Sequence, residues 1–169
     1  SLGDGTVGLM SSVDDIGAFD IISIATSNGT TCAVTSSNAA RCWGDNSNGR
    51  MGYGNQTNIS DGTTAISTAT DIDVVGAGTV DSADQVVAQI APGIATCMVS
   101  TSGQAKCWGM YRYGSLGDGT TANWGDNTGE EPAHKSWFDF GSKVVQIASK
   151  PTGSTSVGTC ALTETGEIY

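Results

Sequence analysis

A repeated segment with paired cysteines constrains the fold of this chain more than any other feature of its sequence. In the fullest copy, Cys97 and Cys107 stand ten residues apart and are followed by Trp-Gly and then by Leu-Gly-Asp-Gly. A second copy keeps the pair as Cys32 and Cys42 and ends in Met-Gly-Tyr-Gly. A third is divided between the two ends, with Cys160 near the last residue and Leu-Gly-Asp-Gly near the first. Three copies in the same register predict a repeat protein with one small structural unit per copy.

Each copy is preceded by a short segment with the pattern of a strand. Residues 21–25, 87–91 and 144–148 place one polar residue between apolar neighbours, which is typical of a strand with one buried face. The polar residue is Ser23, Gln89 or Gln146, and the neighbours expected on the buried face are Ile22, Ala88 and Val145 before it and Ile24, Ile90 and Ile147 after it.

A tight hairpin is predicted inside each copy. Six residues after the first cysteine stands Asn38, Gly103 or Gly166, and Asn and Gly are the residues that tolerate a left-handed backbone. This position fits the last residue of a three-residue hairpin loop. Each unit is therefore expected to form three or more short antiparallel strands.

The hairpin sets the two cysteines of a copy opposite each other. Cys32 then faces Cys42 and Cys97 faces Cys107, and opposed residues of antiparallel strands have Cα atoms about 4.5–5.5 Å apart, which is within the range of a disulfide. Reduced cysteines in a core are the alternative, whereas this spacing does not fit a zinc site. Cys160 is expected to be unpaired or to bond another chain. Disulfides would place the protein in an oxidising setting, extracellular or at a cell surface.

The copies divide a single domain, residues 1–169, into repeat units of approximately 1–54, 55–119 and 120–169. The last unit is incomplete and would be completed by the register of residues 1–6. Because Gly, Ser, Thr, Asn and Val are frequent and strong helix formers are scarce, we expect an all-β fold. The predicted architecture is a β-propeller-like repeat of short antiparallel sheets, or blades, with about three units and long inserts.

These motifs resemble the regulator of chromosome condensation repeat, in the cysteine-bearing form common in secreted bacterial proteins. The resemblance rests on the cysteine pair, the turn glycine, Cys-Trp-Gly and Leu-Gly-Asp-Gly-Thr, and it covers about half of the chain. It implies a β-propeller of four-stranded blades, usually seven. The nucleotide-exchange and chromatin roles of the family do not carry over, because no matching motif is present. Trp43 and Trp108 are repeat positions, so they are expected in the core and do not indicate light sensing.

Charge and hydropathy exclude several classes of partner. The net charge of −10 and the scattered Lys and Arg residues argue against a nucleic-acid partner, which needs a basic face. No apolar run is long enough to span a membrane. Asn28, Asn55 and Asn58 begin glycosylation sequons, a pattern that also arises by chance in a chain so rich in Thr and Asn.

No catalytic, cofactor or metal site is predicted. His134 is the only histidine and lies in a polar insert, so we expect a surface residue and no enzyme. Gly3, Gly5 and Gly8 satisfy a dinucleotide-binding pattern, but they belong to the terminal turn of a repeat. Residues 126–130 offer carboxylate oxygens without the spacing of a calcium loop, which favours solvated acids.

The sequence leaves two functions open. One is a structural subunit that assembles with itself into an extracellular fibre or surface layer. The complementary halves of a repeat at the two ends predict a longer array, either within one chain that carries more repeats or by strand exchange between copies, whose head-to-tail contacts close into rings or extend into filaments. A plain truncation of a longer propeller is the alternative explanation of those halves. The other function is a propeller fragment that binds a glycan or a surface protein through its inserts at 55–85 and 121–142.

Overall fold

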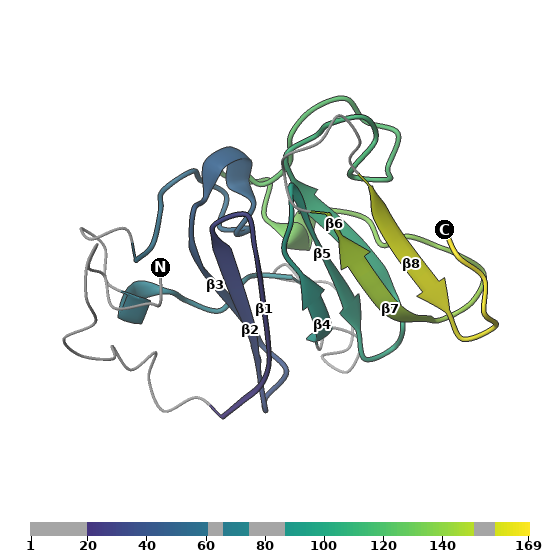
Figure 1. Cartoon of the computed structure of the whole chain (residues 1–169). Coiled ribbons are helices and arrows are strands. Elements are labelled where there is room, and N and C mark those ends of the chain that lie inside the picture. The colour runs from purple at the N-terminus through teal and green to yellow at the C-terminus, as the bar shows by residue number, and fades with distance from the viewer. Residues whose placement is uncertain (1–19, 61–65, 75–86, 151–157) are drawn as a thin grey trace.

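The structure is a computed structural model that describes residues 20–60, 66–74, 87–150 and 158–169. Three small antiparallel sheets follow one another in chain order and stack face to face (Figure 1). Short 3-10 turns are the only helical elements in the described part of the chain. The expected all-β repeat of small sheets is confirmed. The motif at residues 1–6 lies outside the described residues, so its completion of the third unit stays a prediction.

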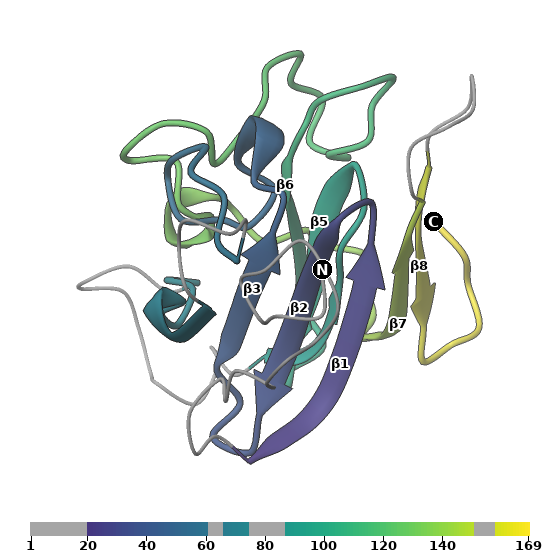
Figure 2. The same ribbon diagram turned by 60° about the vertical axis from the view of Figure 1, so that its left-hand side comes forward.

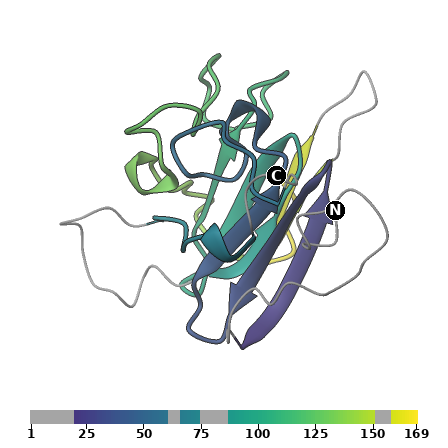
Figure 3. The ribbon, with the colours of Figure 1, turned by 90° about the vertical axis from the view of Figure 1, so that its left-hand side faces the viewer.

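The strands are short and their order is the same in each sheet. The first sheet consists of β1 Ile21–Ser27, β2 Thr30–Thr35 and β3 Ala40–Gly44; the second of β4 Val87–Ala91, β5 Ala95–Ser100 and β6 Ala105–Gly109; the third of β7 Val144–Ser149 and β8 Thr159–Thr163. Three 3-10 turns lie between them: η1 Ser47–Gly49, η2 Ile66–Thr68 and η3 Pro132–His134. The segments that follow β3 and β6 gather at one end of the stacked sheets (Figures 2 and 3).

The hairpin loop has the predicted form. Asn38, Gly103 and Gly166 all have a left-handed backbone, with φ of 61°, 86° and 85°. In the first hairpin the Asn38 N–H donates to the Thr35 carbonyl at 2.8 Å, and the Thr35 N–H donates to the Ala39 carbonyl at 2.9 Å. These bonds define a tight turn that ends in a left-handed residue, which explains why only Asn or Gly occupies this position.

The hairpin register brings the cysteines together. Cys32 lies opposite Cys42 and Cys97 lies opposite Cys107. Both pairs are at disulfide distance, with S–S separations of 2.03 and 2.05 Å. Cys160 occupies the same position in the third sheet, where it is exposed and free. Each bonded pair joins the last two strands of its own sheet, so the disulfides stabilise single sheets rather than the stack.

The burial predicted for the first strand of each unit is partly wrong, because the strand contains a β-bulge. The pairing register shifts between Val87 and Gln89 and between Val144 and Gln146, so one extra residue stands in each strand. The bulge reverses the alternation of side chains before it. As a result Val87 and Val144 are buried together with Ile90 and Ile147, whereas the residues predicted to be buried at the bulge are exposed: Ile22, Ala88 and Val145.

The pattern predicted that the polar residue in the middle of this strand faces away from the core, but in the second sheet this residue contacts the neighbouring sheet. Gln89 faces the third sheet, where its side-chain amide donates to the Ile147 carbonyl at 3.2 Å and accepts from the Ile147 N–H at 3.0 Å. The side chain thus links two sheets. Its equivalents Ser23 and Gln146 are exposed.

The core lies between the sheets, in two clusters. We define the front face of a sheet as the side turned toward the preceding sheet in the stack, and the back face as the opposite side. The back face of the first sheet and the front face of the second share one cluster, which contains Cys32, Val34, Ile90 and Met98. The second cluster repeats this between the second and third sheets, with Cys97, Val99, Ile147 and Ala161.

The fourth strand that the family resemblance implies is reduced to single bridges. Gly44 pairs with Ile59 and Gly109 pairs with Trp124, each at one position outside the named strands. Within the described residues, the first sheet therefore has three strands and one bridge, and the second has three strands and two, because Ala105 also pairs with Phe138. Trp43 and Trp108 lie in the core, with exposures of 6% and 0%, as predicted.

Loss of a disulfide should weaken one hairpin without changing the fold. Replacing Cys97 and Cys107 together by alanine is expected to lower the free energy of unfolding by about 2–3 kcal/mol, because the loop that the bond closes is short. Urea unfolding measures the change, and non-reducing peptide mapping checks the pairing. Recovery of free thiols at Cys32, Cys42, Cys97 and Cys107 from the native protein would contradict the assignment.

The bulge makes two neighbouring residues respond differently to truncation. Ile147→Ala is expected to cost about 2–5 kcal/mol, because Ile147 is 3% exposed between two sheets. Val145→Ala is the matched control and should change stability by less than about 0.5 kcal/mol, because Val145 is 55% exposed. Similar losses for both variants would contradict the bulged register.

Candidate interaction site at the open edge of the third sheet

The third sheet leaves part of one strand edge unpaired within the described residues. Ala161 and Tyr169 exchange two backbone hydrogen bonds of 3.0 and 2.9 Å, and the pairing along that edge of β8 goes no further toward its beginning. In antiparallel strands the bonded positions alternate, so the N–H and C=O of Thr159 point to the same edge as those of Ala161. Among the described residues these two groups of Thr159 pair with no strand on that edge.

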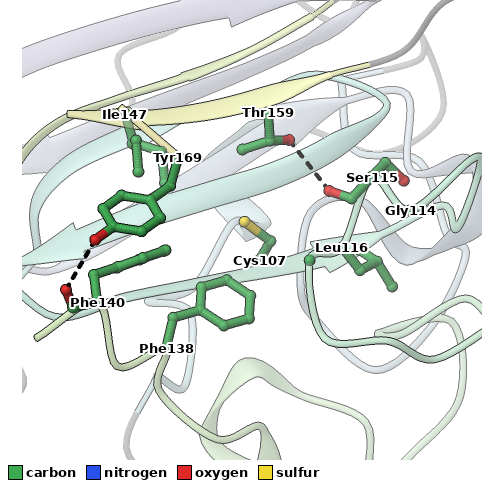
Figure 4. A pocket seen from close by; sticks show the side chains of 11 residues that line it. Cys107, Gly114, Ser115, Leu116, Phe138, Phe140, Ile147, Thr159 and Tyr169 are labelled. Carbon is green, nitrogen blue, oxygen red and sulfur yellow. Dashed lines mark hydrogen bonds between the residues drawn. The ribbon is translucent and has the colours of Figure 1, made fainter. Parts of the chain in front are cut away.

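An apolar pocket of about 250 Å³ lies beside this edge, between the second and third sheets (Figure 4). Its floor is formed by the buried side chains of Leu116, Ile147 and Ala161. Its volume is below the roughly 300–1,000 Å³ typical of ligand pockets, so it suits a single side chain better than a larger ligand.

Three aromatic rings form the opposite wall of the pocket. The centroids of Phe138 and Phe140 are 5.9 Å apart, and those of Phe140 and Tyr169 are 4.9 Å apart. The Tyr169 hydroxyl donates to the Phe140 carbonyl at 3.4 Å. The insert at 121–142 thus reaches the edge of the third sheet and shapes the pocket there.

The back face of the third sheet is exposed where the equivalent faces are buried. Ile168 is 75% exposed, Cys160 is exposed and Leu162 is half-buried. Their equivalents in the second sheet are at most 3% exposed, because the third sheet covers them: Ala105, Cys97 and Val99. At the other end of the stack, Ile24 on the front face of the first sheet is 64% exposed, whereas its equivalents Ile90 and Ile147 are each 3% exposed.

A buried lysine of the second sheet forms hydrogen bonds with both inserts. Lys106 is 1% exposed, and its Nζ donates to the carbonyls of Val74 and Pro132 at 3.1 and 2.9 Å. It also lies 3.8 Å from the centre of the Trp137 ring. Burial lowers the pKa of Lys106 to about 8, because desolvation disfavours the ammonium ion, although Asp73 opposes the shift.

The other aromatic residues of this insert are also used in packing. Trp124 is half-buried, bridges the backbone of Gly109 and lies 4.7 Å from the Lys135 Nζ. Lys135 in turn forms an ion pair with Asp118. With Trp137 held over Lys106, neither indole of this insert forms a freely exposed platform.

The remaining residues singled out in the sequence are not brought together. His134 is exposed and its Nδ1 lies 3.3 Å from a Glu131 carboxylate oxygen. Within the part of the chain that the structure describes, no three His, Cys, Asp or Glu side chains are grouped as metal ligands. The glycine pattern at residues 3–8 lies outside that part. No helix among the described residues is long and apolar enough to cross a membrane.

Comparison with known proteins identifies the type of repeat around the first sheet. The sequence model of the regulator of chromosome condensation (RCC1) repeat matches residues 21–50, which run from β1 to just past η1. The chain thus contains an RCC1-type repeat around its first sheet. No curated protein matches the sequence.

Several solved structures share the fold. The human protein WBSCR16 superposes with a TM-score of 0.62 at 19% identity, over 93% of this chain and 33% of that one. Prp20p from Saccharomyces cerevisiae gives 0.56 at 20% identity, and yeast RCC1 (Prp20) bound to Kap60 gives 0.54 at 19%, each over 88% of this chain and 31% of the other. This chain spans about a third of the length of these proteins.

Sequence reasoning predicted the unmatched strand at Cys160 but did not find the pocket. The signal was present in the aligned registers, which show that Tyr169 has the same place in the third unit as Lys106 in the second. What could not be read from the alignment is that residues of the insert, Phe138 and Phe140, form the opposite wall.

The buried lysine should give this RCC1-type chain an alkaline rise in stability. In the folded protein Lys106 loses its proton near pH 8, whereas an unfolded chain holds it until about pH 10.5. Between these values the unfolded state binds more protons, so the free energy of unfolding rises with pH, by up to about 1 kcal/mol per pH unit. Above pH 10 Tyr53 opposes the rise, because burial raises its pKa to about 12.

Urea unfolding from pH 7 to pH 10 measures this effect, in a Cys160→Ser background that prevents thiol exchange. Lys106→Met should abolish the rise and lower stability, because the Val74 and Pro132 carbonyls lose their donor. An unchanged pH dependence in Lys106→Met would contradict the assignment.

Proposed function

We propose that this chain is a self-assembling structural repeat module, which joins to further copies by stacking one sheet on another. The observation that carries the proposal is the repeated contact between neighbouring sheets, in which the back faces of the first and second sheets are each buried by the sheet that follows. The back face of the third sheet carries apolar side chains at the same positions, with Ile168 75% exposed. A further sheet, of a longer chain or of another copy, would cover it in the same way.

The opposite end of the stack offers a matching surface. The front face of the first sheet exposes Ile24, whose equivalents Ile90 and Ile147 pack against back faces. A contact between the back face of one copy and the front face of another is heterologous, so it gives a ring if it closes and a filament if it does not. The net charge of −10 limits non-specific association, because copies repel one another.

An extracellular or cell-surface setting fits this proposal. Two cysteine pairs at disulfide distance persist only outside a reducing cytosol. We propose no enzymatic activity, because the single histidine is exposed beside a carboxylate and no nucleophile contacts it among the described residues.

Binding of a protein partner is the second candidate. The pocket with its wall of Phe138, Phe140 and Tyr169 favours a peptide side chain over a glycan, because it is small and its lining is apolar. The yeast protein Prp20p binds Gsp1p and histones, and yeast RCC1 (Prp20) forms a complex with Kap60. Those partners belong to that protein, and they support only the general capacity of such scaffolds to bind proteins.

Self-association tests the first proposal. Sedimentation velocity over a wide range of concentration should show species larger than the 17.1 kDa monomer, and negative-stain images should show rings or filaments. Ile168→Asp is expected to abolish association, because it places a charge on the back face of the third sheet. Tyr113→Asp is the matched control, since Tyr113 is 70% exposed and lies outside the three sheets. A monomer at every concentration would overturn the proposal.

A further inference from the structure

Three tripeptides of this chain have the pattern of acceptors for asparagine-linked glycans: residues 28–30, 55–57 and 58–60. All three lie in the described part of the chain. A glycosyltransferase that acts on a folded protein must reach the amide nitrogen of the asparagine and the hydroxyl of the third residue. The exposure and hydrogen bonding of these two groups therefore decide which tripeptide can be modified.

The tripeptide at 28–30 is closed by the fold. Asn28 lies in the tight turn between β1 and β2 with a φ of 54°, and its carbonyl accepts from Arg50 Nη1 at 3.1 Å. Thr30 is fully buried, and its hydroxyl donates to the Asp45 carbonyl at 2.6 Å. A transferase cannot reach this hydroxyl unless the hairpin opens.

The tripeptide at 58–60 is held against the first sheet. Ile59 exchanges two backbone hydrogen bonds with Gly44, at 2.7 and 3.2 Å. The side-chain oxygen of the half-buried Asn58 accepts from the Asn46 N–H at 2.9 Å, and Ser60 is 3% exposed. Access to the Ser60 hydroxyl therefore requires this segment to leave the sheet.

The tripeptide at 55–57 is open. Asn55, Gln56 and Thr57 are all exposed. The Asn55 side-chain oxygen accepts from the Thr57 N–H at 2.8 Å, which forms an Asx-turn and holds the amide group close to the third residue. The Thr57 hydroxyl forms no hydrogen bond among the described residues, so it is available to an enzyme.

The hydrogen bonds of Asn55 are compatible with an attached glycan. An asparagine amide has two N–H groups and an oxygen with two lone pairs. One N–H of Asn55 donates to the Tyr53 carbonyl at 3.0 Å, and the oxygen accepts from Asn46 Nδ2 at 3.3 Å as well as from Thr57. Glycosylation replaces one hydrogen of the nitrogen, so the second N–H can keep its bond to Tyr53. The loop can therefore keep its conformation in the modified chain.

We propose that Asn55 is the acceptor of an asparagine-linked glycan on the folded chain, whereas Asn28 and Asn58 are not modified. The donor is a sugar activated by a diphosphate group. The Asn55 nitrogen forms a bond to the anomeric carbon, the bond from that carbon to the diphosphate oxygen breaks, the diphosphate-bearing group leaves, and the nitrogen releases a proton.

The position of Asn55 in the fold suits a bulky, solubilising group. Asn55 belongs to the segment that follows β3, which lies at one end of the stacked sheets (Figures 2 and 3). A glycan there leaves the faces of the sheets free. This modification is independent of the proposed assembly.

Enzymatic glucosylation of the folded, unglycosylated chain tests the proposal. The enzyme is a soluble asparagine glucosyltransferase that uses UDP-glucose and is chosen because it modifies synthetic peptides of residues 26–32, 53–59 and 56–62. The intact mass of the chain should increase by one hexose, which peptide mapping should place at Asn55. The rate at Asn55 should exceed the rates at Asn28 and Asn58 by at least about tenfold, because those two sites react only after local opening. No hexose on the folded chain, or equal rates at the three sites, would overturn the proposal.

Variants of the loop check that the exposed tripeptide is recognised. Thr57→Ala should abolish glucosylation at Asn55, because the hydroxyl is lost, whereas Thr57→Ser keeps a hydroxyl and should retain it. Gln56→Ala is the matched control, since Gln56 is exposed and is the variable residue of the pattern, and it should leave the rate unchanged. Glucosylation of Asn55 at the original rate in Thr57→Ala would sink the assignment. The modified chain should also unfold at the same temperature as the unmodified one, and a lower temperature would contradict the retained bond to Tyr53.

Discussion

Apolar side chains on both faces of each small sheet are the constraint on which this structure depends. In β5 the neighbouring residues Met98 and Val99 belong to different core clusters, one on each side of the sheet. A three-stranded sheet of five- and six-residue strands cannot bury both faces by itself, so each sheet is stable only between neighbours. Because each sheet needs a neighbour on both faces, the sheets stack. The outer faces of the described stack are therefore uncovered within the described residues.

Specific contacts hold neighbouring sheets in one arrangement. Trp108 reaches from the second sheet into the loop after the first, and Gln89 bonds the backbone of Ile147 in the third. Arg41 and Lys106 bind the inserts at equivalent positions of β3 and β6, the first to Asp71 and the second to backbone carbonyls. Because these bonds are directional, they fix the offset between sheets, which apolar packing alone leaves loosely defined.

The same features connect the fold with its proposed role. The described residues contain the same kind of contact between neighbouring sheets twice, once on each side of the second sheet. The stacking of further sheets that we propose would use this kind of contact again.

The sequence by itself determined the local structure of this protein. The left-handed loop residue at Asn38 and Gly103, the strand that precedes each copy and the opposition of Cys97 and Cys107 follow from turn chemistry and spacing, which act over a few residues. Only the tertiary structure decided which side chains are buried. The bulge exposes Val145, and the absence of a described sheet in front of β1 exposes Ile24 although its pattern matches that of Ile90. The pocket likewise depends on Phe138 and Phe140 reaching the third sheet from an insert, because burial depends on neighbours distant in sequence, which no local pattern specifies.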